Sequence, residues 1–225
     1  VYAYELKERK ESTDDIQGYD SSDVLYLIMP DRFANGDQSN DQISMSTEYV
    51  MDRSKPGARH GGDLKGIEDH LDYFVDLGVT AIWLNPVLEN DGKGGSYHGY
   101  FSTDMFHVDR RLGSNEDYLR LINKAHQKGL RVVMDMIFNH IGANHPWVLD
   151  VPSKDWFNVS PSKRGNHAKA IFYDNYASTY DSEVMKYAGF GIDLNQANPH
   201  VGKYLIQNSI WWIELSLIHI SEPTR

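Results

Sequence analysis

The chain has 225 residues, 40% of them hydrophobic and 12% aromatic, which is enough for one large domain or two small ones with a sizeable core. Its formal net charge of −10, without any basic run, argues against nucleic acid and anionic membrane surfaces and leaves a neutral partner as the better fit. The absence of cysteine excludes disulfides and thiol chemistry, and no apolar stretch approaches the roughly 20 residues that span a bilayer.

The first 22 residues are polar, and we expect residues 1–22 to be a linker or the tail of a preceding domain. Because the chain starts at Val1, without a methionine or a signal peptide, we also expect its true N-terminus to be missing. The apolar run at residues 24–29 then has the length and composition of a buried strand.

Two helices are predicted from apolar residues at helical spacing. The first spans residues 64–77 and stops at Gly78, and the second opens at Ser114, has Asp117 at the capping-box position and stops at Gly129. Strands at residues 81–84 and 131–136 follow them. The predicted core-facing residues are Leu64, Ile67, Leu71, Phe74 and Val75 in the first helix, and Tyr118, Leu121, Ile122 and Ala125 in the second.

This order of strand, loop, helix, glycine and strand is the βαβ pattern of an α/β fold with a parallel sheet. The pattern stops after residue 140, where residues 141–197 mix Pro, Gly, Asn, Asp, Ser and aromatics, so we predict a functional loop or a small subdomain there. A third helix starts at Asn198 and Pro199. Its predicted buried face comprises Val201, Tyr204, Leu205, Trp211 and Trp212. We expect the pair Trp211 and Trp212 to pack in the core.

Polar residues close the strand at 131–136, at the end where parallel α/β sheets meet their ligands. Asp135, Asn139 and His140 have a spacing that closely resembles the first signature of the α-amylase superfamily, glycoside hydrolase family 13. Residues 96–100 (Ser-Tyr-His-Gly-Tyr) resemble the family's segment after the preceding strand, so the two matches occur in the right order. Further similarity, closest to the neopullulanase and cyclomaltodextrinase group, lies in residues 29–37, 59–64, 198–201 and 210–214.

The resemblance implies the N-terminal portion of a (β/α)₈ TIM barrel, an α/β fold, with about three βα units and a domain B insert after the third strand. Residues 23–140 would form the first part of the catalytic barrel, residues 141–197 domain B, and residues 198–214 the third barrel helix. Residues 1–22 would be the junction with an N-terminal β-sandwich that is absent from this chain.

The resemblance also implies roles at the site. A sugar ring would stack on Tyr100, and His98 and His140 would hydrogen-bond its hydroxyls. Asp135 and Asn139 would brace the loop after the third strand. From the residues alone, a barrel-rim aromatic is the favoured interpretation of Tyr100, and a satisfied core histidine is the alternative for His140. A zinc site with His145 is a third option, disfavoured because an i, i+5 spacing differs from the i, i+4 pair of zinc-binding helices. The implied substrate-binding residues are His98, Tyr100 and His140, and the implied structural residues are Asp135 and Asn139.

Oxygen-bearing side chains gather around Gly36 in a pattern that suits Ca²⁺, which takes six to eight oxygen ligands. The alternative is an Asx-rich turn whose side chains bond their own backbone. The resemblance adds the carbonyl of Gly61 and the carboxylate of Asp63, although Asp63 also stands where the N-cap of the first helix belongs. The predicted structural calcium site comprises Asn35, Asp37, Asn40, Asp41, Gly61 and Asp63.

The family's catalytic carboxylates are expected after the fourth strand and later, so no residue of this chain is assigned as catalytic. Residues 215–225 lack the expected glycine and the aspartate-bearing strand, and we expect them to be a non-native tail, a translated sequencing-adapter read-through. Asp193, Leu194 and Asn195 match the family's domain B signature, but Gly191 and Ile192 replace the residues that separate subgroups. We therefore expect the 225-residue chain to be an inactive fragment.

For the parent protein, the resemblance implies a retaining α-glucan hydrolase that cleaves α-1,4 bonds, with α-1,6 cleavage left open. Starch, pullulan, cyclodextrin or maltooligosaccharide would be the substrate. The alternatives are a non-catalytic α-amylase-like barrel protein and a calcium-stabilised carbohydrate-binding module. Hydrolysis and transglycosylation share the same motifs, so the choice between them stays open. The oligomeric state also stays open, and bacterial periplasm or cytoplasm is the expected compartment.

Overall fold

The computed structural model describes residues 19–43, 51–92, 95–158, 169–171, 188–216 and 219–221. Four parallel strands form the main sheet in the order β1-β2-β3-β7, namely β1 (Leu25–Ile28), β2 (Ala81–Leu84), β3 (Arg131–Asp135) and β7 (His219–Ser221). Between consecutive strands run α2 (Leu64–Asp69) with α3 (Leu71–Asp76), then α4 (Asn115–Gln127), then α5 (Pro199–Ser216). The predicted α/β class with a parallel sheet is therefore confirmed.

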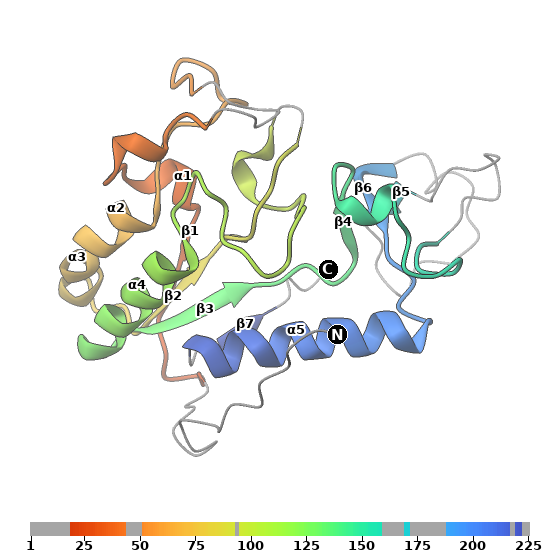
Figure 1. Cartoon of the computed structure of the whole chain (residues 1–225). Helices are drawn as coiled ribbons and strands as arrows, with labels where there is room; N and C mark the ends of the chain where they lie inside the picture. Colours follow the sequence, from red (N-terminus) through yellow and green to blue (C-terminus); the bar gives the residue numbers. More distant parts are fainter. Residues whose placement is uncertain are drawn as a thin grey trace.

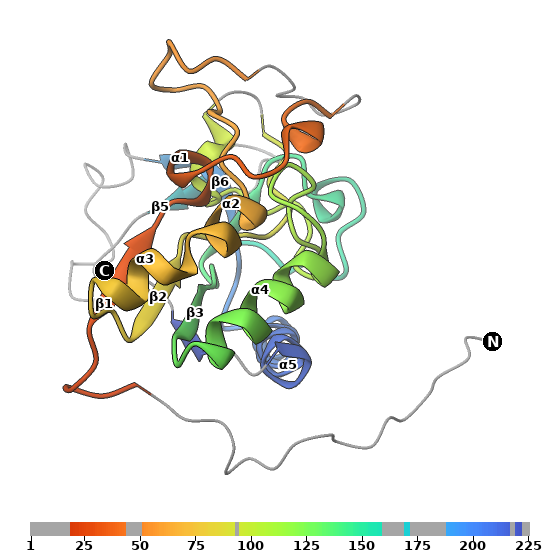
Figure 2. The same cartoon turned by 90° about the vertical axis from the view of Figure 1, so that its left-hand side faces the viewer.

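One face of the sheet packs on the helices and carries the core (Figures 1 and 2). Side chains alternate between the two faces of a strand, so every second residue of β1, β2 and β3 belongs to this layer. Tyr26 of β1 shows the direction, because its ring centroid lies 5.2 Å from that of Phe74 in α3. The buried strand residues of this layer are Ile28, Ile82, Leu84, Val132 and Met134.

The first strand is an edge strand rather than the buried strand that was predicted. Leu25 and Leu27 are 38% and 60% exposed. They lie on the face opposite Tyr26, and within the described sheet β1 has a neighbour on one side only. A continuous apolar run becomes a buried strand only where both of its faces are covered, so the prediction was wrong for the sheet as it stands here.

The predicted helix at residues 64–77 is two short helices, α2 and α3, which break at His70. The backbone of His70 has φ −114° and ψ 18°, and its Nδ1 lies 2.7 Å from the carbonyl oxygen of Gly66. Val75 is 42% exposed, so its place in the buried stripe was wrong. Gly78 has a left-handed φ of +80° and ends the helix as predicted. The other four predicted positions, Leu64, Ile67, Leu71 and Phe74, are buried.

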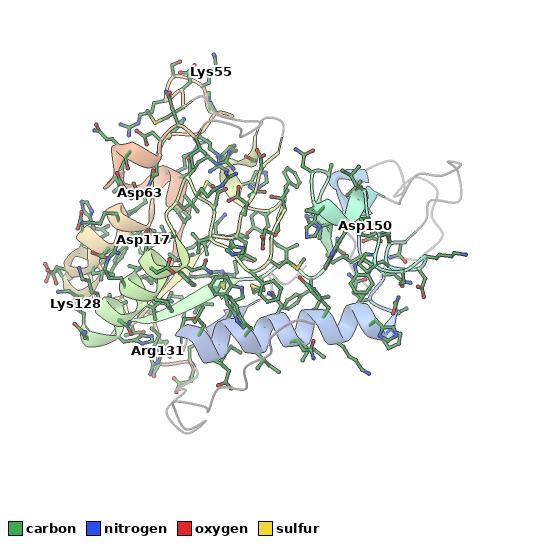
Figure 3. All side chains as sticks on the ribbon, viewed as in Figure 1. Lys55, Asp63, Asp117, Lys128, Arg131 and Asp150 are labelled. Carbon is green, nitrogen blue, oxygen red and sulfur yellow. The ribbon has the colours of Figure 1, made fainter. Side chains whose placement is uncertain are left out.

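The second predicted helix, α4, is confirmed together with its capping box. Ser114 N donates to Asp117 Oδ2 at 2.9 Å, and Asp117 N donates to Ser114 Oγ at 3.1 Å. Figure 3 shows Asp117 and Lys128 at opposite ends of this helix. Gly129 follows with a φ of +76°. The predicted stripe of Tyr118, Leu121, Ile122 and Ala125 is fully buried.

A small antiparallel sheet with the order β4-β6-β5 lies beyond the C-terminal end of β3 (Figure 1). Its strands are β4 (His140–Gly142), β5 (Lys169–Ile171) and β6 (Ala188–Asp193). The predicted subdomain therefore contains a sheet of its own, whose first strand starts at His140, one residue before the predicted boundary at residue 141. Residues 159–168 and 172–187 of the predicted domain B lie outside the described residues.

The third helix, α5, starts as predicted after Asn198, whose Oδ1 accepts a hydrogen bond from His200 N at 2.9 Å. It continues to Ser216, beyond the predicted helix end at residue 214, and residues 219–221 pair in parallel with β3. That residues 215–225 are a non-native tail stays a prediction. The remaining tail residues lie outside the described part of the chain. No helix in the described ranges is long and apolar enough to cross a membrane.

Core packing is the role of the tryptophan pair, as predicted. Trp212 is fully buried, and its ring lies 5.7 Å from that of Tyr118 in α4. Its Nε1 donates to the carbonyl oxygen of Met105 at 2.9 Å. Trp211 is half-buried and contacts the ring of Phe106 at 5.2 Å. The pair therefore joins α5 to α4 and to the loop after β2.

His145 joins the small subdomain to an aromatic cluster and gives a pH-dependent prediction. Its Nδ1 accepts a hydrogen bond from Trp147 N at 3.1 Å, the two rings lie 4.4 Å apart, and burial lowers the pKa of His145 to about 4. Protonation then favours the unfolded chain, so stability present above pH 6.5 is lost as the pH falls from 6.5 towards 4, by up to about 3 kcal/mol.

We expect His145→Asn, which keeps an acceptor for Trp147 N but does not titrate, to weaken this dependence. The measurement is urea unfolding of both proteins between pH 7 and pH 4, followed by tryptophan fluorescence. Equal losses of stability in the two proteins would show that His145 is not responsible.

Candidate functional site

The candidate site lies where the loops after β2 and β3 meet, at the C-terminal ends of these strands. The hydroxyl of Tyr100 donates to Oδ2 of Asp135, the last residue of β3, at 2.8 Å. Burial and this hydrogen bond raise the pKa of Tyr100 well above its ordinary value, so the hydroxyl stays a donor. Two predicted site residues, one in the loop after β2 and one at the end of β3, are thereby brought together, and the Asp135 carboxylate is buried. Its bracing role stays a prediction.

His140 is also part of this junction, with both ring nitrogens close to protein atoms. Its Nε2 lies 2.8 Å from the carbonyl oxygen of Tyr100, which can only accept, so Nε2 carries the proton. Its Nδ1 then accepts from Nδ2 of Asn139 at 3.2 Å. The imidazole edge packs against Gly191, where an added Cβ would come within 2.5 Å of His140 Cδ2. These contacts fit a satisfied buried histidine, and its predicted contact with a sugar stays a prediction.

The 95–101 segment carries the other two predicted sugar-contact residues. It contains the 3-10 helix η3 (Ser96–His98), and His98 Nδ1 accepts from Tyr100 N at 3.0 Å. The ring centroids of His98 and Tyr100 lie 5.6 Å apart, and the ring of Phe101 lies 4.8 Å from His98. Since His98 and Tyr100 are half-buried, this segment presents an aromatic surface of the kind that sugars stack on.

Asn90 connects the two ends of this segment and was missed in the sequence. Its Oδ1 accepts from Phe101 N at 2.7 Å, and its Nδ2 donates to the carbonyl oxygen of Ser96. The side chain is buried, so both bonds are made away from water. A single asparagine after a strand is a common loop residue, and nothing in its spacing indicated this role.

A buried cluster of one aspartate and two arginines lies behind the segment. Arg59 Nη2 lies 3.1 Å from Asp109 Oδ2, and Arg111 Nε donates to Asp109 Oδ1 at 2.9 Å. Burial acts to raise the pKa of Asp109, but the Arg59 charge and the Arg111 hydrogen bond outweigh it and hold the pKa well below its ordinary value. Asp109 is therefore ionised, and the cluster fixes the loop beneath the site.

Hydrogen bonds also join the residues at the start and the end of the small subdomain. Gln196 Nε2 donates to the carbonyl oxygens of Phe138 and Asn139 at 2.8 and 3.2 Å. Leu194 N donates to Asn139 O at 2.9 Å. The backbone carbonyl of Asn139 therefore contacts the far end of the small subdomain, and its predicted role in bracing the loop after β3 stays a prediction.

The predicted calcium residues divide into two groups. Asn35 Nδ2 donates to Asp41 Oδ1 at 2.7 Å, and an added Cβ on Gly61 would come within 2.4 Å of the same carboxylate oxygen. Asp37 and Asp63 instead receive backbone N–H groups, because Asp37 caps η2 (Gln38–Asn40) and Asp63 caps α2. Asp63 also accepts from Gly36 N and Asp37 N at 3.1 and 2.8 Å.

Two amide oxygens in this loop bear on the predicted calcium site. Among the described residues, the side-chain oxygens Oδ1 of Asn35 and Asn40 are buried without a hydrogen-bond partner. The pKa of Asp41 is raised, mainly because burial disfavours its charged form. A positive charge nearby would offset this desolvation of the carboxylate. Within the described residues, no group of three or more His, Asp or Glu side chains gathers as a metal site.

The sequence matches the family described as alpha amylase, catalytic domain, over residues 27–218. It is 36% identical over 202 residues to the intracellular maltogenic amylase of Bacillus subtilis, and 32% identical over 203 residues to neopullulanase 2 of Thermoactinomyces vulgaris. These alignments cover 85% of this chain and 31% and 32% of the relatives. The chain thus spans about a third of the length of the curated relatives it matches.

The fold has the same relationship. An Anoxybacillus α-amylase superposes with a TM-score of 0.71 at 37% identity, and this chain covers 40% of it. A cyclomaltodextrinase superposes with a TM-score of 0.67 at 29% identity, with 34% of that protein covered. The strand and helix order described above is therefore that of a partial barrel. The chain belongs to the α-amylase family, glycoside hydrolase family 13, and carries part of its catalytic domain.

Proposed function

We propose that this chain forms one side of the substrate cleft of a retaining α-glucan hydrolase that acts on α-1,4 bonds. The proposal rests on the two hydrogen bonds of Tyr100. Its hydroxyl donates to Asp135, and its backbone carbonyl oxygen accepts from Nε2 of His140. Two loops at the C-terminal ends of neighbouring strands thereby share one fixed aromatic platform. The names of the relatives, maltogenic amylase and neopullulanase among them, support an α-glucan as the substrate class.

In this proposal the platform binds one glucose unit and leaves the carboxylate chemistry to other parts of the domain. A fixed ring offers its face to the sugar C–H groups, while nearby donors and acceptors orient the hydroxyls. The buried Asp135 carboxylate is engaged by the Tyr100 hydroxyl, which suits bracing better than attack on the anomeric carbon. Retaining hydrolysis needs a nucleophile and an acid/base about 5–5.5 Å apart.

The test measures binding of maltoheptaose to the 225-residue chain by NMR or calorimetry. We expect weak binding that Tyr100→Ala lowers by about tenfold or more, because the stacking surface is lost. Tyr100→Phe should keep the ring but lose the bond to Asp135, and should fall between the two. Equal binding by all three proteins would contradict the proposed site.

The same chain should release no reducing sugar from pullulan, starch or cyclodextrin above a buffer blank. Measurable release would show that the described site and the rest of this chain already contain a working carboxylate pair. Tight maltoheptaose binding without any hydrolysis, in the intact parent protein, would favour a non-catalytic carbohydrate-binding relative.

We also propose that the loop of Asn35, Asn40, Asp41 and Gly61 binds a structural Ca²⁺, with Asp37 and Asp63 as further predicted ligands. The buried oxygens of the two asparagines support it. Adding CaCl₂ at about a hundred times its Kd should stabilise the fold by about 2.7 kcal/mol and raise the Tm. Asp41→Asn should abolish this rise, whereas Asp69→Asn, in a surface pair with Lys65, should leave it intact. A Tm that does not respond to calcium or to a chelator would overturn the proposal.

A further inference from the structure

We propose that Arg32 and Arg59 are positioning residues, which hold the 95–101 segment in the conformation that presents His98 and Tyr100 to a sugar. The inference rests on the proposed function, since that function gives these two side chains their ligand. Arg32 lies in the short helix α1 (Pro30–Phe33) and Arg59 in the loop between α1 and α2, whereas the segment follows β2. The contact therefore joins neighbouring loops at the same end of the sheet.

Arg32 acts through the ring of Tyr97. Its guanidinium is fixed by three acceptors, namely Asp31 Oδ2 at 2.8 Å and the carbonyl oxygens of Pro56 and Ala58 at 2.7 and 2.8 Å. The guanidinium carbon then lies 4.0 Å from the centroid of the Tyr97 ring. A cation held over an aromatic face attracts it, and here the cation cannot follow if the ring moves away.

Arg59 acts on the residue before Tyr97. Its Nη2 lies 3.1 Å from Ser96 Oγ and 3.3 Å from the carbonyl oxygen of Ser96. The same nitrogen lies 3.1 Å from Asp109 Oδ2, and the whole side chain is buried. Hydrogen bonds from a charged donor away from water are stronger than those between neutral groups, so Ser96 is fixed relative to the cluster.

The segment needs such support because its own structure is short. The helix η3 has three residues, and Gly95 and Gly99 on either side have left-handed φ values of +70° and +88°. Glycine restricts the backbone least of all residues, and a three-residue 3-10 turn contributes few hydrogen bonds of its own. Two arginine contacts between these glycines therefore have a direct effect on where His98 and Tyr100 lie.

The experiment uses the 225-residue chain and the variants Arg32→Gln, Arg32→Lys and Arg59→Lys. The control is Arg110→Gln, because Arg110 forms its surface ion pair with Glu89, which lies outside the 95–101 segment. Amide hydrogen exchange is measured in residues 96–101 and in α4, and maltoheptaose affinity is measured in parallel. Arg32→Gln tests the proposal even if the more deeply buried Arg59 does not tolerate change.

We expect Arg32→Gln and Arg59→Lys to speed exchange in residues 96–101 by about tenfold while α4 keeps its protection. Maltoheptaose affinity should fall severalfold in both, and Arg32→Lys should recover part of the loss because it keeps a cation near Tyr97. Arg110→Gln should match the parent chain in both measurements.

Unchanged exchange and affinity in folded Arg32→Gln and Arg59→Lys would overturn the proposal. Equal acceleration in α4 and in residues 96–101 would also overturn it, because the arginines would then support the fold in general. If the parent chain itself fails to bind maltoheptaose, the proposed function fails separately, and the exchange measurement still decides whether the arginines position the segment.

Discussion

Replacing Asp109 by asparagine is expected to destabilise the chain by about 3–5 kcal/mol. The change keeps the size of the side chain but removes the charge that compensates Arg59 and Arg111, both of them buried. A guanidinium left without a counter-ion in a buried site is far more costly than the pair was favourable. The loss is a large fraction of the roughly 5–15 kcal/mol that stabilises a typical domain. Urea unfolding followed by tryptophan fluorescence measures it.

The matched control is Asp72→Asn, which breaks a surface pair between Asp72 and Lys128. Surface pairs contribute about 0–1 kcal/mol, so this variant should unfold close to the parent chain. The pH dependence gives a second check. The folded-state pKa of Asp109 is depressed, so its contribution is present above the ordinary carboxyl pKa of about 4 and is lost as the pH falls further below that value. A similar loss of stability in both variants would show that the cluster has no special role.

Much of the fold could be predicted because hydrophobic spacing and helix-end signals are local. The stripe of α4, its capping box and Gly129 are all written within 16 residues and came out as predicted. The exposure of Leu27 could not be predicted in the same way, because it depends on which strand lies next to β1. The break at His70 was hidden for another reason, since the buried positions keep their spacing through it.

The site shows the same division between local and long-range information. Asp135, Asn139 and His140 could be found because a strand end and a family signature coincide. The role of Asn90 could not, nor could that of Arg59, although residues 59–64 resemble the family. Both roles come from contacts with Ser96 at distances of 6 and 37 residues along the chain. The signature brings together residues that are close in sequence, whereas these two long-range contacts are identified only in three dimensions.

Replacing Gly99 by alanine is expected to have the largest effect on the site itself. Gly99 has a left-handed φ of +88°, which costs other residues about 1–2 kcal/mol. In addition, an added Cβ would come within 2.1 Å of the carbonyl oxygen of Pro86, part of the backbone just after β2. Backbone on both sides must therefore move, and Tyr100, the next residue, moves with it. We expect maltoheptaose binding to fall by about tenfold or more, together with a loss of stability.

Gly95→Ala separates the two causes, because Gly95 begins the same segment with a φ of +70° but has open space where a Cβ would lie. It should cost only the conformational penalty of about 1–2 kcal/mol and should leave the position of Tyr100 nearly unchanged. Stability by urea unfolding and maltoheptaose affinity are measured for both variants. If Gly95→Ala weakens binding as much as Gly99→Ala does, flexibility of the segment controls the platform rather than the close contact with Pro86. If only Gly99→Ala weakens it, that contact sets the distance between the platform and the end of β2.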